Sequence, residues 1–489
     1  MKVNQKHTLN FRIKLCKAVS ARLWILLVVC QFLNSSLYAQ STGLSQSAGV
    51  ETLVNAQDAG ASKIEHAAQE LSELWSLHTQ ATLIEQRKNN FHSPYFSSNS
   101  LLNQSQGDRD RSYTLSVTGY LGIRLWSGAQ AYYNPEIFEG TPFSSALVGL
   151  GGFQNGELQK GMYIPGVAYS ARAFIRQTIG LGGEQENIAS DVVNQLATSV
   201  DKNRLVFTWG KVASLDFFDM NTYSHDPRIQ FLNFSIFSSA AYGYAADAKG
   251  FTYGLVTEWY QGDWVLRAGR LAVPKSPNTM ELDYTLTKDY VDQLEITHSH
   301  SLIGKQGSVR ALVFRQYAYM ANYQDAITQG IANNTTPNIY SARVGYQSMF
   351  GYAVNVEQAI NTDLGIFARW SWNNDQTETQ TLDVGRSLSL GASLRGNDWG
   401  RGDDIFGVAV AVNAVSDSEV QYLQRGGLTM FIGDGAIDYK TEQIFETYYS
   451  AKLKKALYIS ADYQHILNPA YNSSRGPVNV VGVRLHYEI

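Results

Sequence analysis

The chain has 489 residues, of which 39 are basic and 43 acidic, for a formal net charge of −4. This balance excludes nucleic acid as a partner and excludes a basic patch for the membrane surface, because both need clustered positive charge. Aromatic residues make up 12% of the chain, and 41 glycines stand beside only 10 prolines. This composition favours one large β-structure over several small domains.

Residues 1–39 have the pattern of a secretory signal peptide. Six basic residues and no acidic one precede or flank an apolar run at residues 23–33, and Ala39 is a small residue at the expected cleavage site. The run is about eleven residues long, too short to span a bilayer as a helix. Cleavage after Ala39 leaves 33 basic residues against 43 acidic ones, a net charge of about −10.

Both cysteines, Cys16 and Cys30, lie in this predicted signal peptide. The mature chain would therefore carry neither a disulfide framework nor a thiolate metal site, and we expect no cofactor. A lipoprotein anchor at Cys30 is the alternative, but the preceding Val29 is not the small residue that such processing needs.

Residues 40–74 form a polar lead-in rich in Ser, Gln and Ala. Residues 56–74 have the pattern of a short amphipathic helix. We interpret the segment as a partly ordered lead-in, and a plug of the following domain is the alternative.

From residue 75 to residue 489 the sequence repeats segments in which apolar and polar residues alternate. In the last segment Val481, Val483 and Leu485 share one face, while Arg484 and His486 share the other. Side chains alternate across a strand, so this pattern predicts strands with one apolar and one polar face. The predicted strands are residues 75–86, 112–126, 129–134, 167–178, 203–210, 250–260, 264–271, 291–300, 307–320, 346–360, 364–373, 385–396, 404–414, 443–453, 456–466 and 479–489.

The links between these segments alternate between short and long. Short periplasmic turns and long extracellular loops are typical of outer-membrane barrels, so the fold class is all-β: a transmembrane antiparallel β-barrel of about 16 strands. One link, residues 179–202, is long where a short turn is expected, and residues 191–198 suggest a short helix within it.

Charged residues gather on the face of the strands opposite to the apolar one. A basic side chain that faces lipid at mid-depth costs about 2–4 kcal/mol, so these residues are expected to face a water-filled lumen. The candidates for lining the pore and binding substrate are Arg124, Tyr132, Glu136, Arg172, Arg176, Glu258, Arg267, Glu357, Arg369, Arg395, Glu446, Asp462 and Arg484.

A lumen of mixed sign does not select strongly for cations or anions. Arginine donors and carboxylate acceptors match the hydroxyl groups of a neutral sugar, and an inward aromatic such as Tyr132 can stack on a sugar ring. The alternatives are that the inward charges pair only to support the wall, or that the arginines select acidic solutes.

The segment 216–247 is too long for a simple turn and is dense in polar and aromatic residues. Long structured loops are usually functional, and this one is a candidate to fold inward and narrow the channel. The residues expected to fix its shape are Asp216, Asp219, Asn221, His225, Asp226 and Arg228. Hydrogen bonding within the loop alone, or a cation site built from the acids, are the alternatives.

Several long strings resemble the carbohydrate-selective porins of the OprB type. They lie at residues 121–137, 171–184, 209–233, 247–254, 386–396, 431–435 and 462–486, and W-G-K-V-A-S-L-D-F-F-D-M-N-T-Y-S-H-D-P-R-I-Q-F-L-N at 209–233 is the most telling. The resemblance covers residues 72–489. It implies a sixteen-stranded porin in the outer membrane of a Gram-negative bacterium that lets small sugars diffuse without energy coupling.

The partners that follow are small neutral sugars, outer-membrane lipid and lipopolysaccharide, and the barrel-assembly machinery during insertion, with a monomer or a homotrimer as the assembly. A general or acidic-solute porin is the alternative function. An outer-membrane barrel enzyme lacks support, because no nucleophile elbow or zinc-binding helix accompanies His298 and His300. A surface adhesin is disfavoured by the length of the loops.

Overall fold

The computed structural model describes residues 73–102, 110–162, 166–190, 193–379 and 381–489. The predicted signal peptide and nearly all of the polar lead-in fall on residues 1–72, outside the described part of the chain. Both stay predictions.

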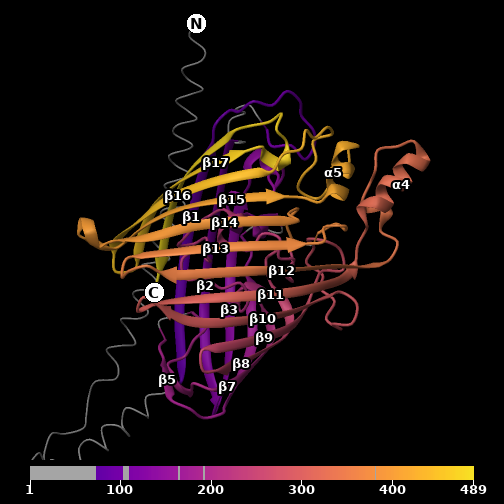
Figure 1. Cartoon of the computed structure of the whole chain (residues 1–489). Helices are drawn as coiled ribbons and strands as arrows, with labels where there is room; N and C mark the ends of the chain where they lie inside the picture. Colours follow the sequence, from indigo (N-terminus) through magenta and orange to yellow (C-terminus); the bar gives the residue numbers. More distant parts are fainter. Residues whose placement is uncertain (1–72, 103–109, 163–165, 191–192, 380) are drawn as a thin grey trace, which may run out of the picture. The chain divides into compact units, whose positions relative to one another are not determined.

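Sixteen antiparallel strands among the described residues close into one barrel, as predicted (Figure 1). Each strand pairs with the next barrel strand along the chain, and β1 closes the ring by pairing with β18. The barrel strands are β1 Trp75–Lys88, β2 Arg111–Trp126, β3 Ala129–Thr141, β4 Tyr169–Gly180, β7 Arg204–Val212, β8 Thr252–Gln261, β9 Trp264–Ala272, β10 Tyr290–Leu302, β11 Lys305–Tyr319, β12 Tyr346–Ala359, β13 Leu364–Asn373, β14 Arg386–Gly396, β15 Arg401–Ala414, β16 Glu442–Lys454, β17 Leu457–Leu467 and β18 Val478–Glu488.

The end of β3 is the one boundary that the alternation misplaced by more than a few residues. The predicted strand stops at residue 134, whereas β3 continues to Thr141. Pro135 lacks an amide donor, so the sequence favours the end of the strand just before it. In the structure Pro135 lies where the register between β3 and β4 shifts, and a strand tolerates proline at such an irregularity.

The connections divide the barrel into a short-turn end and a long-loop end. Gly128, in the two-residue turn between β2 and β3, has φ +75°. A Cβ atom there would lie 2.3 Å from the carbonyl oxygen of Thr178, so the turn requires glycine. The C-terminus and β5 lie toward the short-turn end, opposite to α4 and α5 at the long-loop end (Figure 1).

The long link at the short-turn end is a β-hairpin, and the prediction of a helix at residues 191–198 is wrong. β5 (Gln185–Ile188) pairs with β6 (Thr198–Asp201), so Thr198 opens a strand, and residues 193–197 form no helix. Residues 191–192 lie outside the described residues. The Asp201 carboxylate accepts a hydrogen bond from the Gly182 amide at 2.7 Å, which closes the hairpin against its own base.

Exposure along the strands confirms the two predicted faces. On β13, Ile366 and Trp370 are 41% and 48% exposed, whereas Arg369 between them is 2% exposed. Other strands repeat this alternation with large apolar side chains outside, among them Leu121, Ile123, Leu125, Trp209, Phe406, Val410, Val412 and Ile459. The exposed apolar side chains make the outer wall suited to lipid, and Arg369 lies on the opposite, lumen-facing side.

The helices lie in the connections. They are η2 Phe143–Ser145, η3 Gly156–Met162, η4 Ser214–Asp216, α3 Phe234–Phe237, α4 Tyr323–Asn333, η5 Tyr340–Ala342, η6 Asn397–Trp399, α5 Asp417–Gln424 and η7 Pro469–Tyr471. Within the described residues, no helix combines the length and the apolar composition needed to cross a membrane.

Three buried carboxyl groups lie among the long loops. Asp375 accepts a hydrogen bond from the Ser416 amide at 2.6 Å, and Asp383 accepts one from the Thr429 hydroxyl at 2.7 Å. Burial raises the pKa of Asp375 to about 6 and, together with the charge of Asp375, that of Asp383 to about 7. Burial and these two neighbours raise the pKa of Glu419 on α5 well above its usual value.

The packing of α5 is therefore expected to weaken as the pH rises. These carboxyls hold protons more tightly in the folded protein, so the stability that Asp375 and Asp383 contribute is complete below about pH 4 and is lost as the pH rises through about 6 and 7. The loss amounts to a few kcal/mol, since each pKa unit is worth about 1.4 kcal/mol. Hydrogen exchange of the α5 amides, corrected for its intrinsic pH dependence, should be faster at about pH 8 than at about pH 5.

The double variant Asp375→Asn/Asp383→Asn should remove most of this pH dependence, because these two carboxyls titrate between about pH 5 and pH 8 and a neutral amide has no proton to lose. The control is Glu281→Gln, since the Glu281 side chain is 72% exposed in another loop and pairs with Lys275. An unchanged pH profile in the double variant Asp375→Asn/Asp383→Asn would show that the buried carboxyls do not control the packing of α5.

Candidate functional site

The connection between β7 and β8, residues 213–251, folds into the barrel, and we call it the inner loop. Every side chain from residue 231 to residue 249 is buried. The short helix α3 lies within this stretch, and Asn233 caps it by accepting a hydrogen bond from the Ser235 amide. Aromatic residues of the loop pack against inward residues of the wall, for example Tyr242 against Phe314 at 5.2 Å between ring centroids. The core of the protein is thus inside the barrel.

Charged residues of β12, β13, β16 and β18 hold the inner loop in place. Arg369 donates to the Asp219 carboxylate at 3.2 Å and to the Ile236 carbonyl at 3.0 Å. Glu446 accepts from the amides of residues 232 and 233 at 2.5 and 2.9 Å. Arg484 donates to the carbonyls of Pro227 and Gln230 at 2.9 and 2.6 Å.

This arrangement corrects the sequence prediction that placed these side chains in the lining of an open lumen. Arg369 and Arg484 are each 2% exposed, and Glu446 is fully buried. Glu357 accepts from the amide and hydroxyl of Thr222, and Asp462 is 6% exposed. The inner loop covers Arg369, Arg484, Glu446 and Glu357, and their hydrogen bonds satisfy backbone groups of that loop, so this half of the wall does not face open space.

The connection between β3 and β4 also enters the barrel. Residues 149–155 are all buried. The Glu442 carboxylate accepts from the amides of Gly151 and Gly152 at 3.0 and 2.7 Å, and the Gln464 side chain donates to the Gln154 carbonyl at 2.8 Å. The two inserted segments together leave space mainly along β2–β4 and β7–β9.

Two cavities occupy this remaining space. The loop-side cavity has a volume of about 430 Å³, and Tyr120, Lys160, Arg172 and Arg228 are among its lining residues. The turn-side cavity has a volume of about 250 Å³ and is lined by residues nearer the short turns, such as Tyr260 and Arg267. Five residues line both cavities, so a single layer of side chains separates them: Arg176, Gln195, Asp216, Phe217 and Met220.

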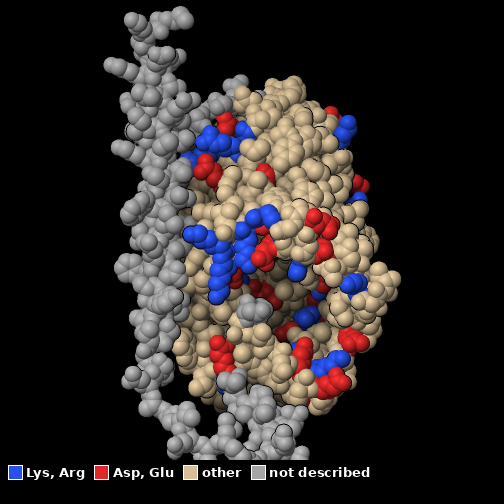
Figure 2. All heavy atoms as spheres, turned by 90° about the vertical axis from the view of Figure 1, so that its left-hand side faces the viewer, with Lys and Arg blue, Asp and Glu red and all other residues tan. Residues whose placement is uncertain are grey.

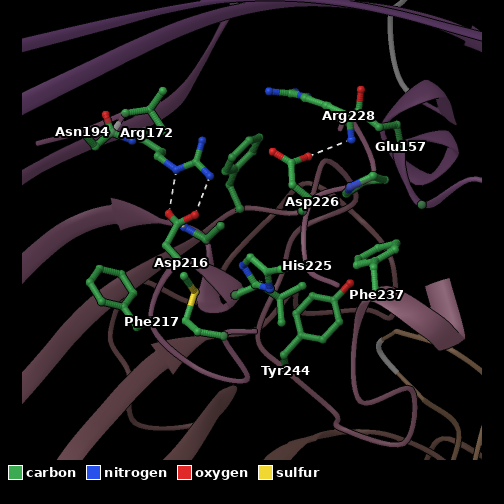
Figure 3. Close-up of a pocket in the computed structure, with 18 of the residues that line it drawn as sticks. Glu157, Arg172, Asn194, Asp216, Phe217, His225, Asp226, Arg228, Phe237 and Tyr244 are labelled. Carbon is green, nitrogen blue, oxygen red and sulfur yellow. Dashed lines mark hydrogen bonds and ion pairs between the residues drawn. The ribbon is translucent and has the colours of Figure 1, made fainter. Parts of the chain in front are cut away.

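An ion pair between β4 and the start of the inner loop marks this junction. The Arg172 guanidinium donates twice to the Asp216 carboxylate, at 2.6 Å for each bond (Figure 3). The paired side chains are 15% and 29% exposed, so both are reached from the cavity. Phe217 follows Asp216 directly and is among the residues that line both cavities.

Arg176 is a second cation at the junction. Its guanidinium carbon lies 5.2 Å from the centre of the Tyr132 ring and 5.4 Å from that of Phe174, and it donates to the Asn194 carbonyl at 3.0 Å. Within the described residues, no carboxylate lies within ion-pair distance of Arg176. The junction of Arg172, Arg176 and Asp216 therefore carries one net positive charge.

Other charges around the cavities are neutralised in groups. On the loop side, Arg228 bonds to Glu136 at 2.7 Å and to Glu157 at 3.0 Å, and Lys160 lies 3.4 Å from Glu136 (Figure 3 labels Arg228 and Glu157). The Tyr169 hydroxyl also donates to Glu136, which is 1% exposed. Glu136 is therefore covered by its partners and does not itself form the cavity surface.

On the turn side, Arg267 bonds to Glu258 at 2.9 Å and to Glu295 at 3.2 Å. Arg204 lies over the Tyr260 ring at 3.9 Å and pairs with Glu186 of the β5–β6 hairpin. Figure 2 faces the short-turn end of the barrel and shows it hollowed, with acidic and basic side chains in and around the hollow.

The structure thus divides the sequence-predicted site residues. Eight line a cavity: Arg172, Arg176, Glu258, Arg267, Asp216, His225, Asp226 and Arg228. Asp219 and Asn221 anchor the inner loop, since the Asn355 amide bonds to both. Arg124 donates to the carbonyls of residues 73 and 197, and Arg395 is an exposed residue near the short-turn end.

Sequence reasoning missed part of the cavity lining. Asn194 and Gln195 come from the link before β6, and Lys160 comes from η3. The unusual length of the link at residues 179–202 was the available signal, because a long connection at the short-turn end needs a structural reason. Among the described residues, no group of three or more His, Cys, Asp or Glu side chains is arranged to hold a metal ion.

The family profile described as "Carbohydrate-selective porin, OprB family" matches residues 110–488. The chain belongs to the OprB family. None of the curated proteins compared with the chain matches it significantly. Family membership and the closed barrel identify an outer-membrane porin.

A solved porin shares this fold. The high-pH structure of Pseudomonas putida OprB aligns with a TM-score of 0.63 at 14% identity, over 91% of this chain and 100% of that one. The outer membrane channel DcaP of Acinetobacter baumannii aligns with a TM-score of 0.46 at 9% identity, over 85% and 97% of the two chains. At 14% identity the OprB structure supports the fold of this chain and not the details of its lumen.

Proposed function

We propose that the protein lets small neutral sugars diffuse passively across the outer membrane through the loop-side and turn-side cavities. The observation that carries this proposal is the junction, where one layer of side chains separates the two spaces and presents Arg172, Asp216 and the Phe217 ring together. Guanidinium donors and a carboxylate acceptor match sugar hydroxyls, and an aromatic ring offers an apolar surface to the ring carbons.

The size and the charge of the cavities support a small and neutral solute. The loop-side cavity of about 430 Å³ lies within the range of about 300–1,000 Å³ that is typical of small-molecule sites. The carboxylates of Glu136, Glu157 and Glu258 are each paired with an arginine, so much of the local field is cancelled.

The one unpaired cation at the junction favours a second candidate function. Arg176 would attract an acidic solute, and a general or acidic-solute porin without a sugar site follows if that attraction dominates. Single-channel conductance in planar bilayers separates the two functions. Saturable block of the current by glucose or longer maltodextrins, without block by a dicarboxylate, supports the sugar site, and the reverse result supports the acidic-solute porin.

Substitutions at the ion pair should weaken the sugar block about tenfold or more, because a hydrogen bond to a charged group is worth about 1.5–3 kcal/mol. The variants are Arg172→Met, Asp216→Asn and the double variant. In the double variant neither charged side chain of the ion pair is left without its partner. Arg395→Met is the control, since Arg395 lines neither cavity. If sugars block the current of the double variant and the parent equally well, the ion pair is not part of the proposed sugar site.

A further inference from the structure

The outer wall of β8–β12 carries charged residues on its lipid-facing side. The strand registers place Leu255 beside Arg270, Arg270 beside Asp292, and Asp292 beside Arg315. The Arg270 and Asp292 side chains are 47% and 43% exposed, and Leu255 in the same row is 42% exposed. This row therefore faces outward and not into the lumen.

The row carries one net positive charge. Arg270 donates twice to the Asp292 carboxylate, at 2.7 Å for each bond, which satisfies that carboxylate. Arg315 donates to the Ser348 hydroxyl at 3.1 and 3.3 Å. Among the described residues, no carboxylate lies within ion-pair distance of Arg315.

The neighbouring rows place these charges just inside the membrane interface at the long-loop end. On the loop side, Tyr290 pairs with Tyr317, with ring centroids 5.8 Å apart. On the other side, Leu294 and Val313 are paired and are 44% and 54% exposed. Tyrosines mark the interface of outer-membrane barrels, whose long loops face the cell exterior, so the row meets the outer leaflet.

A shallow groove of about 560 Å³ runs along this part of the wall, and we call it the wall groove. Its lining includes Leu255, Ala268, Arg270, Asp292, Val313 and Arg315. The small side chain of Ala268 leaves the depression between larger neighbours. The groove thus combines a cationic end near the interface with an apolar floor toward the membrane centre.

We propose that the wall groove binds a phosphorylated lipid of the outer leaflet. Its phosphate would bond to Arg315 and approach Arg270, while the start of its acyl chains would cover Leu294 and Val313. An arginine fork matches the oxygens of a phosphate, and an anion there neutralises a charge that otherwise faces lipid.

The charges of the barrel favour a lipid over a second copy of this chain as the occupant. A second copy would have to offer an outward carboxylate at the same depth. In the part of the chain that the structure describes, the other outward carboxylates in strands at the long-loop end are Glu85 and Glu139, and they already bond to Arg111 and to the Tyr113 hydroxyl. A lipid phosphate in the surrounding leaflet is not already bonded to another side chain of the barrel in this way.

Native mass spectrometry of the full-length protein tests the proposal, with bisphosphorylated lipid A and its dephosphorylated form as probes. The parent should retain bisphosphorylated lipid A about tenfold more tightly than the dephosphorylated form, as expected for the loss of a charged hydrogen bond. Arg315→Gln should show a similar loss, whereas Arg315→Lys should keep most of the binding because the charge remains.

Arg87→Gln is the matched control, because the Arg87 side chain is 54% exposed on β1, outside the groove. The proposal is overturned if Arg315→Gln retains lipid A as the parent does, or if the two forms of lipid A bind the parent equally. A change of oligomeric state in Arg315→Gln without a change in lipid binding would also overturn it. The comparison of bisphosphorylated with dephosphorylated lipid A binding to the parent protein tests the proposal even if a variant does not fold.

Discussion

Replacement of Arg369 by methionine is expected to loosen the inner loop and to raise the conductance of the channel. Arg369 bonds to Asp219, to the Ile236 carbonyl and to the Ser224 carbonyl, all within the barrel. Methionine removes these donors and leaves buried acceptors without partners, and breaking a buried ion pair costs about 3–5 kcal/mol. The wall strands keep their pairing, so the barrel should persist while the loop moves.

Single-channel recording of Arg369→Met should therefore show a larger and noisier current than the parent. Arg395→Met is the control, because it removes an exposed arginine on the same face of the neighbouring strand. If the two variants conduct alike and melt at the same temperature, Arg369 does not hold the loop and the channel width has another origin.

An arginine in place of Val410 is expected to impair insertion of the barrel. Val410 is 44% exposed in the middle of the apolar outward run of β15, between Leu390 and Phe445 on the neighbouring strands. An arginine at that depth costs about 2–4 kcal/mol in the membrane, which lowers the equilibrium constant for folding by a factor of about 30 to several hundred.

The measurement is the yield of folded barrel after refolding into lipid vesicles, read from protease resistance. Val410→Leu is the control, because it keeps an apolar side chain of similar size and should fold as the parent does. Equal yields for Val410→Arg and the parent would mean that this face of β15 does not contact lipid.

The strands of this barrel were predictable because each one carries its own two-residue pattern. Ile366 and Arg369 differ in their environments as the alternation requires, without any knowledge of the neighbouring strands. Pro135 shows the limit of such local reasoning, since the irregular register that accommodates it depends on the partner strand.

The partners of the inward charges were not predictable in this way. Glu446 and Arg484 share the lumen-facing pattern with Arg172, yet the first two bond to the backbone of the inner loop, and the third faces a cavity. The difference depends on the path of a loop that begins more than 200 residues earlier in the chain than Glu446. No local period in the sequence encodes such a path.

The inserted segments occupy one half of the barrel and leave the cavities against the other, and this gives the two halves separate roles. Arg369, Glu446 and Arg484 on β13, β16 and β18 bond to the backbone of the inner loop, whereas β3, β4, β8 and β9 supply side chains that line the cavities. Substitutions at distant sites have nearly additive effects. Variation on the cavity side can therefore change what the channel admits while the loop keeps its support, so solute preference and structural integrity can diverge independently among related chains.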